Sequence, residues 1–153
     1  MKVVINKCFG GFSLSALAIK RLSELEGKEC YFYKHNFSNT YKKIPIEDCK
    51  GYTMWSAFTE GDEDKLNEFL NTYPQDFSNG KDEYDETYEL ISLDIRPNIR
   101  HDKLLVMVVE ELGDKANGMC AELEVIKIPD DVDYEIVEYD GLEHIAEKHR
   151  TWS

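Results

Sequence analysis

The fold is decided first by residues 3–15, which read VVINKCFGGFSLS. Residues 3–5 predict a buried strand, because short β-branched runs fit a pleated sheet surface. Two adjacent glycines, Gly10 and Gly11, come next and predict a loop that can adopt positive φ. The stretch therefore predicts a strand followed by a glycine loop.

A helix is predicted directly after this loop. Apolar residues recur at helical spacing over residues 14–25. Ser13 or Ser15 can cap the start of this helix, and Gly27 stands where a helix C-cap belongs. A second strand is predicted at residues 30–33, which are rich in aromatic side chains.

The middle of the chain is polar and less regular. Lys42, Lys43 and Pro45 indicate an exposed loop. The pattern further predicts a strand within residues 52–58, a helix over residues 62–73 and a strand over residues 88–93. We interpret residues 34–86 as an acidic elaboration of the core, and whether it is mobile is left open.

The C-terminal third has the clearest helical pattern. Asp102 can cap a helix whose apolar stripe runs over residues 104–112, and Gly113 ends it.

Two strands are predicted after that helix, over residues 121–128 and 134–139, with a turn at residues 129–131 between them. Residues 140–143 read DGLE and resemble a capping box. They predict a last short helix that ends at Arg150.

The order of these elements indicates the fold class. Helices and strands alternate early and a strand pair comes late, which favours an α+β fold over a strictly parallel α/β sheet. At 153 residues the chain is predicted to form a single compact domain over residues 1–153. This domain would hold a small mixed sheet, a C-terminal hairpin and a short final helix.

Charge is uneven along the chain, whose formal net charge is −13. Residues 1–59 carry a net +4, whereas residues 60–89 carry eleven acids and two bases, a net −9. Duplex nucleic acid is disfavoured as a partner, because its binding depends on many Lys and Arg side chains that neutralise phosphates. A small anionic ligand remains possible, because one site needs only a few donors. The acidic surplus is explained either by solubility or by mimicry of DNA towards a basic protein surface.

No membrane segment is predicted. The longest apolar run, residues 104–109, is six residues long, and a bilayer-spanning helix needs about 20. The N-terminal apolar run is too short for the core of a signal peptide. We therefore expect a soluble, intracellular protein.

Cysteine spacing indicates neither a metal site nor a catalytic one. Cys8, Cys30, Cys49 and Cys120 form no C-x-x-C pair, so four reduced thiols are expected, with no metal and no cofactor. Cys8 precedes the glycines, where a lowered pKa could make it a nucleophile. The spacing places none of the candidate bases beside it, namely His101, His144 and His149. We therefore predict no enzyme and no catalytic residues.

The glycine loop is the leading candidate for a ligand site. The N-terminus of a helix offers unpaired N–H groups to a phosphate or carboxylate, and Ser13 could add a hydroxyl donor. The alternative is a tight turn. A second group at the C-terminus combines His149, Arg150 and Trp152, which together offer a donor, a cation and a stacking surface. The alternative there is that Trp152 packs the tail onto the core.

The complete predicted ligand-binding set gathers aromatic, glycine, hydroxyl and cationic residues from both ends of the chain: Phe9, Gly10, Gly11, Phe12, Ser13, Arg21, Arg100, Asn117, His149, Arg150 and Trp152.

Both ends of the chain resemble a family of small bacteriophage and prophage proteins. The resemblance lies in residues 1–27, with INKCFGGFSLS, and in residues 100–153, with EELG, ANG, IPDD, EYDG and HRTW. Most members of that family carry no assigned activity. In size and outline the chain is also similar to phage Thoeris anti-defence sponges.

The second resemblance implies a function without catalysis. It implies a homo-oligomer in the cytoplasm of the bacterial host that captures cyclic ADP-ribose-type immune signals. The ligand residues of the sponges have no counterparts that can be matched one by one here, so the predicted site rests on residue chemistry. The alternative is an acidic inhibitor, or DNA mimic, that blocks a host defence or DNA-binding protein.

Overall fold

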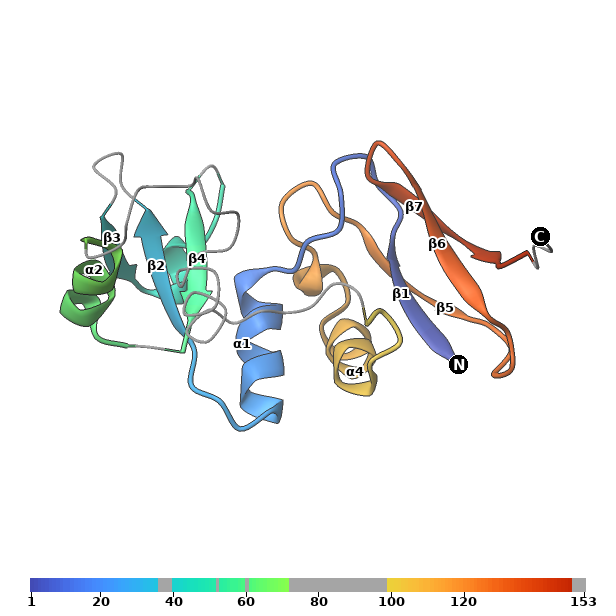
Figure 1. Cartoon of the computed structure of the whole chain (residues 1–153), viewed down its shortest axis with the longest axis horizontal. Coiled ribbons are helices and arrows are strands. Elements are labelled where there is room, and N and C mark those ends of the chain that lie inside the picture. Colours follow the sequence, from blue (N-terminus) through green and yellow to red (C-terminus); the bar gives the residue numbers. More distant parts are fainter. Residues whose placement is uncertain (36–39, 52, 60, 72–98, 150–153) are drawn as a thin grey trace, which may run out of the picture. The chain divides into compact units, whose positions relative to one another are not determined.

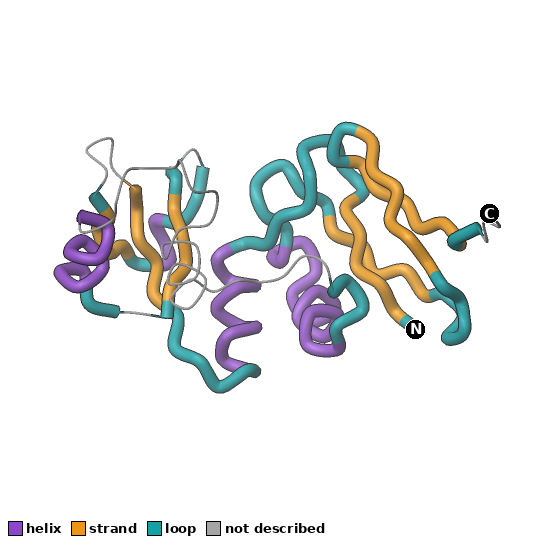
Figure 2. The backbone as a smooth tube through the Cα atoms, viewed as in Figure 1, coloured by secondary structure: helices purple, strands orange, loops and turns teal. Residues whose placement is uncertain are grey.

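The computed structural model describes residues 1–35, 40–51, 53–59, 61–71 and 99–149. Figure 1 shows the elements in chain order, and Figure 2 shows the same view coloured by secondary structure. The described elements are β1 (Lys2–Asn6), α1 (Ala16–Leu25), β2 (Tyr31–His35), β3 (Tyr41–Ile44), η1 (Ile46–Asp48), β4 (Trp55–Phe58), α2 (Glu63–Asn71), α4 (Lys103–Leu112), η3 (Gly113–Ala116), β5 (Leu123–Lys127), β6 (Tyr134–Tyr139) and β7 (Leu142–Glu147).

This arrangement of helices with small sheets confirms the α+β class. Every strand pair in the described part of the chain is antiparallel, so the predicted mixed sheet is not found there. The strand expected over residues 88–93 lies outside the described residues.

Residue contacts divide the chain into two compact units. The first comprises residues 1–22 and 96–153, and the second comprises residues 23–95. A single domain over residues 1–153, elaborated by residues 34–86, stays a prediction.

The first unit is organised around its N-terminal strand. β1 pairs with β5, with Lys2 opposite Lys127 and Asn6 opposite Leu123. The antiparallel pairing continues beyond the strands, because the Lys7 N–H donates to the Glu122 carbonyl oxygen at 2.7 Å. Val3, Val4 and Ile5 are buried as the sequence predicts.

Helix α4 supplies the other half of this core and contacts β1 and β5. Its buried residues are Leu105, Val106, Val108 and Val109. The Asp102 carboxylate accepts hydrogen bonds from the first-turn amides, as an N-cap does, so the predicted start of the helix is confirmed.

The C-terminal hairpin differs from the prediction. β6 pairs with β7 in the register Tyr139 opposite Leu142, whereas β5 pairs with β1 rather than with β6. The predicted short helix opening at residues 140–143 is therefore wrong, because β7 occupies that stretch. Asp140 and Gly141 both have positive φ, 49° and 89°, which is the two-residue turn that favours hairpins.

The second unit contains a three-stranded sheet in the order β3-β2-β4. Its core consists of Tyr33, Phe58 and Leu66, with partly buried Tyr31 and Tyr41 packed against them. β3 forms where the sequence indicates an exposed loop at Lys42 and Lys43. The prediction missed it because only the two ends of this four-residue strand are partly buried.

Candidate functional site

The glycine loop of the first unit packs against the hairpin turn. The Gly10 N–H donates to the Asp140 carbonyl oxygen at 3.2 Å. A Cβ placed on Gly141 would lie 2.1 Å from the Gly11 nitrogen, so only a glycine permits this approach of the two backbones. One amide that the sequence analysis assigned to a phosphate is thus bonded within the chain.

The start of α1 does not coincide with the glycines. The helix begins at Ala16. Ser15 caps it, because its hydroxyl accepts from the Ala18 N–H at 3.1 Å and donates to the Lys115 carbonyl oxygen at 2.6 Å. Ser13 instead donates to the Met119 carbonyl oxygen. Ser15, one of the two predicted caps, is therefore the cap of this helix, and four residues separate Gly11 from it, so the glycines do not open directly into the helix as an anion cradle would need.

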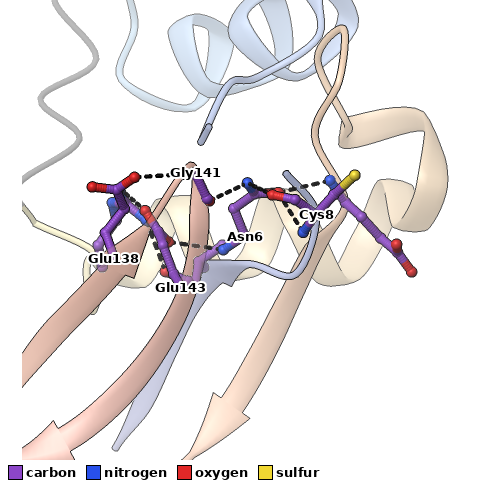
Figure 3. A network of polar contacts seen from close by, with 8 residues as sticks. Asn6, Cys8, Glu138, Gly141 and Glu143 are labelled. Atoms are coloured by element: carbon purple, nitrogen blue, oxygen red, sulfur yellow. Dashed lines mark hydrogen bonds and ion pairs between the residues drawn. The ribbon is translucent and has the colours of Figure 1, made fainter. Parts of the chain in front are cut away.

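Asn6 organises the same end of the unit. Its side chain is completely buried, and its amide nitrogen donates to the carbonyl oxygens of Cys8 and Gly141, both at 2.7 Å. Its amide oxygen accepts from the Glu122 N–H at 2.9 Å. Figure 3 shows this side chain between the β1 end and the hairpin turn. One asparagine thus ties three segments that are far apart in the sequence.

Arg100 and Glu143 form a buried ion pair beside Asn6. Two nitrogens of the guanidinium reach the two carboxylate oxygens at 2.8 and 3.0 Å, and the side chains are 10% and 6% exposed. The carboxylate also accepts from the Asn6 N–H at 2.8 Å. The guanidinium carbon lies 3.6 Å from the centre of the Phe12 ring, a cation–π contact. Arg100 and Phe12, both predicted as ligand residues, are therefore brought together, but each is engaged within the fold.

A hollow of about 540 Å³ opens next to this pair. Such a volume lies within the range of about 300–1,000 Å³ that small-molecule sites occupy. Its lining combines cationic, acidic, aromatic and apolar residues of the first unit: Met1, Arg100, His101, Val132, Asp133, Tyr134, Glu135, Ile136 and Lys148.

His101 and Tyr134 form the aromatic part of this lining. Nδ1 of the imidazole lies 2.6 Å from the phenol oxygen, and the two rings meet edge to face at 88°. Burial raises the pKa of the Tyr134 phenol, and the positive charge of Arg100 opposes that rise. The phenol thus stays protonated at neutral pH and can donate to Nδ1 when that nitrogen is unprotonated.

Lys148 adds an exposed positive charge to the hollow. Its ammonium lies 3.6 Å from the Asp133 carboxylate, and both side chains are more than half exposed. An exposed pair of this kind contributes little stability, so the ammonium can turn to an incoming anion at small cost.

The remaining predicted residues are spread over the molecule. Phe9 is 57% exposed. Arg21 pairs with Glu111 at 3.1 Å, and the Asn117 side chain accepts from the Leu123 N–H at 2.9 Å. His149 is exposed just after β7, and the last predicted residues, Arg150 and Trp152, lie outside the described residues. That the predicted set binds a ligand stays a prediction.

The sequence analysis did not predict most of the residues that line the hollow. It considered His101 only as a base for Cys8, and it named neither Tyr134 nor Lys148. One sequence signal could have identified them. Residues 134–147 contain apolar and polar residues on both sides of an Asp-Gly pair, a pattern that predicts a hairpin, and a hairpin with this turn places Tyr134 and Lys148 at its open end.

Metal and membrane features are absent from the described part of the chain. No group of three or more His, Cys, Asp or Glu residues there could hold a metal ion. No described helix is long and apolar enough to span a membrane. No family model matches the sequence, and neither does any curated protein or solved structure with which it was compared.

Proposed function

We propose that this protein binds a small nucleotide-type anion in the hollow beside His101 and Tyr134, and that it does so without chemical turnover. The observation that carries the proposal is the composition of that hollow, in which two aromatic rings and the Lys148 ammonium line a space of about 540 Å³. Aromatic faces suit a base, and an ammonium suits a phosphate.

The biological setting of the proposal comes from the sequence. The resemblance to phage proteins supports an anti-defence role, in which a cyclic ADP-ribose-type immune signal is sequestered in the cytoplasm of the bacterial host. We propose a homo-oligomer as the active form, since the hollow is open to solvent and a second copy could complete its wall.

Isothermal titration tests the proposal with purified protein and a panel of cyclic ADP-ribose isomers and cyclic dinucleotides. We expect one class to bind, and we expect His101→Ala and Lys148→Ala each to weaken it about tenfold, which corresponds to about 1.4 kcal/mol. Lys103→Ala is the matched control, because Lys103 is also an exposed lysine of the first unit but lies outside the hollow.

The same titration decides about turnover. The ligand recovered after overnight incubation should have an unchanged mass. No binding by any member of the panel, or equal losses in Lys148→Ala and Lys103→Ala, would refute the assignment of the hollow. A cleaved product would refute binding without turnover.

A second candidate function has an observation of its own. Seven acidic residues between positions 130 and 147 are exposed around the C-terminal hairpin: Asp130, Asp131, Asp133, Glu135, Glu138, Asp140 and Glu147. Such a surface suits an acidic inhibitor of a basic host protein, as the alternative from the sequence states. Asp131→Asn/Glu147→Gln removes two of these exposed charges outside the hollow, so under this alternative it should weaken partner binding and should leave ligand binding in the hollow unchanged.

A further inference from the structure

The sheet of the second unit carries a row of two lysines and a tryptophan. In the β3-β2-β4 sheet, Lys34 on β2 lies opposite Lys42 on β3 and opposite Trp55 on β4. Directly opposed residues of antiparallel strands share one face of a sheet. Figure 1 shows β2 between its two neighbours. The three side chains therefore form one line across the sheet, which we call the Lys-Trp row.

This row lies on the face opposite to the core of the unit. Side chains alternate between the two faces of a strand, and Tyr33, next to Lys34, belongs to the buried core with Phe58 and Leu66. Lys34 and Lys42 are both exposed. The aromatic core thus lies on one side of the sheet, and the row lies on the other, where the two lysines are exposed and Phe32 is buried beside Trp55.

The tryptophan of the row is held in place. The Trp55 ring packs edge to face on Phe32 at 5.6 Å between centroids, and Phe32 is only 5% exposed. Trp55 itself is half-buried, so the residue is not fully covered. A ring that is fixed on one side and open on another is a suitable stacking platform.

The two lysines face each other without compensation. Like charges directly opposite each other destabilise a sheet. Among the residues that the structure describes, neither Lys34 nor Lys42 forms an ion pair. The neighbouring Lys43 differs, because its ammonium lies over the Tyr31 ring on the other face. The Lys-Trp row therefore concentrates positive charge in a chain whose net charge is −13.

We propose that the Lys-Trp row binds single-stranded nucleic acid, with a base stacked on Trp55 and the backbone phosphates at Lys34 and Lys42. Charge complementarity selects an anionic occupant, and the accessible indole favours one that carries a base over an acidic peptide. This site is separate from the hollow of the first unit and does not depend on it.

The row is small, so binding is weak and depends on salt. Two phosphate contacts on a single strand give a slope of log affinity against log salt of about −1.4, hence about a sevenfold loss between 50 and 200 mM salt. Duplex DNA should bind more weakly than a single strand, because its bases are stacked inside the helix and cannot reach Trp55.

Fluorescence anisotropy with a labelled ten-nucleotide thymidine strand tests the proposal on the full chain at 50 mM salt. We expect saturable binding that Lys34→Ala/Lys42→Ala reduces at least tenfold. The control Lys50→Ala/Lys65→Ala removes the same charge from exposed lysines of the same unit and should reduce binding less than twofold. In a Trp152→Phe background, Trp55 is the one remaining tryptophan, and its emission should be quenched by the strand.

Several results would overturn the proposal. These are no binding at 50 mM salt, equal losses in the two double variants, or unchanged emission of Trp55 on saturation. Equal affinity for thymidine monophosphate and for the strand would overturn the strand as the occupant. Tighter binding of a duplex of the same length would refute the role of the indole. Circular dichroism of the four proteins checks that each variant is folded.

Discussion

At the scale of single residues, buried polar side chains determine the geometry of the first unit. A hydrophobicity pattern could not reveal the hydrogen bonds of Asn6, because two of its partners, Glu122 and Gly141, lie 116 and 135 positions away. Sequence analysis treats an asparagine after a strand as the start of a loop. Its actual role depends on contacts that only the folded chain creates.

Replacement of Asn6 by alanine should destabilise the protein strongly. The change leaves the carbonyl oxygens of Cys8 and Gly141 and the N–H of Glu122 without partners, and buried unpaired groups cost about 1–3 kcal/mol each. We expect a loss of about 3 kcal/mol in the free energy of unfolding, measured by urea denaturation. Lys7→Ala, an exposed neighbour, should change it by less than about 0.5 kcal/mol. Equal small effects of both changes would contradict this account of the network.

Cys49 illustrates how local charge controls reactivity. Burial, followed by the carboxylates of Asp48 and Glu47, raises the pKa of its thiol to about 11. Alkylation needs the thiolate, which at pH 8 is then about one thousandth of the total. We expect iodoacetamide to label Cys49 far more slowly than the exposed Cys120, as followed by peptide mass spectrometry.

The contribution of the neighbouring carboxylates to the pKa of Cys49 can be measured separately from that of burial. Asp48→Asn removes the nearer acid in the sequence, which lowers the pKa of the thiol, so labelling at pH 8 should become several times faster. Labelling of Cys49 as fast as that of Cys120 in the unmodified protein would show that burial and charge do not protect it.

At the scale of elements, strong local patterns were read correctly and ambiguous ones were not. The glycine loop after β1 and the capped helix α4 were predicted, because β-branched runs, helical spacing and an aspartate cap act over a few residues. β7 was interpreted as a helix, because DGLE fits a capping box as well as a hairpin turn. The choice is made by pairing with β6 and by the contact with Gly10 and Gly11, neither of which is local.

The glycine in that turn provides a direct test of the backbone contact. Gly141→Ala would place a Cβ 2.1 Å from the Gly11 nitrogen, in addition to the strain of a positive φ. Gly27→Ala is a matched control, because Gly27 also has a positive φ but its Cβ would meet nothing within 4 Å. We expect Gly27→Ala to lower the free energy of unfolding by about 1 kcal/mol, because it adds only the strain of a positive φ. Gly141→Ala should lower it by at least about 3 kcal/mol, which is typical of severely destabilising substitutions.

Urea denaturation of the two glycine variants gives both free energies. Equal losses would mean that the turn does not touch the glycine loop in solution.

At the scale of the whole molecule, the candidate site could be predicted only in part. Arg100 was named from its chemistry, but Glu143 was interpreted only as the end of a capping box, because nothing in the sequence shows which of 31 acids would pair with Arg100. The hollow depends on how the 99–102 turn meets the hairpin, which is tertiary information. The division into two units, each with its own buried core, was likewise not evident from composition.

Hydrogen exchange can show whether the two units unfold together. Leu66→Ala removes a side chain that is only 2% exposed from the core of the second unit, at a cost of about 3 kcal/mol. If the units are independent, amide protection should fall in β2 and β4 and stay unchanged in β1 and β5. An equal fall in both would support the single domain that the sequence predicts.

Native mass spectrometry of the protein purified from phage-infected cells tests the central claim most directly, because it weighs the assembled protein with any small molecule that it retains. We expect an oligomer that carries a nucleotide-sized adduct, and we expect a smaller share of the protein to carry the adduct in His101→Ala while the oligomer persists. Bare protein from infected cells, which also takes up no member of the cyclic nucleotide panel when they are mixed, would contradict the claim that the hollow holds a nucleotide-type ligand.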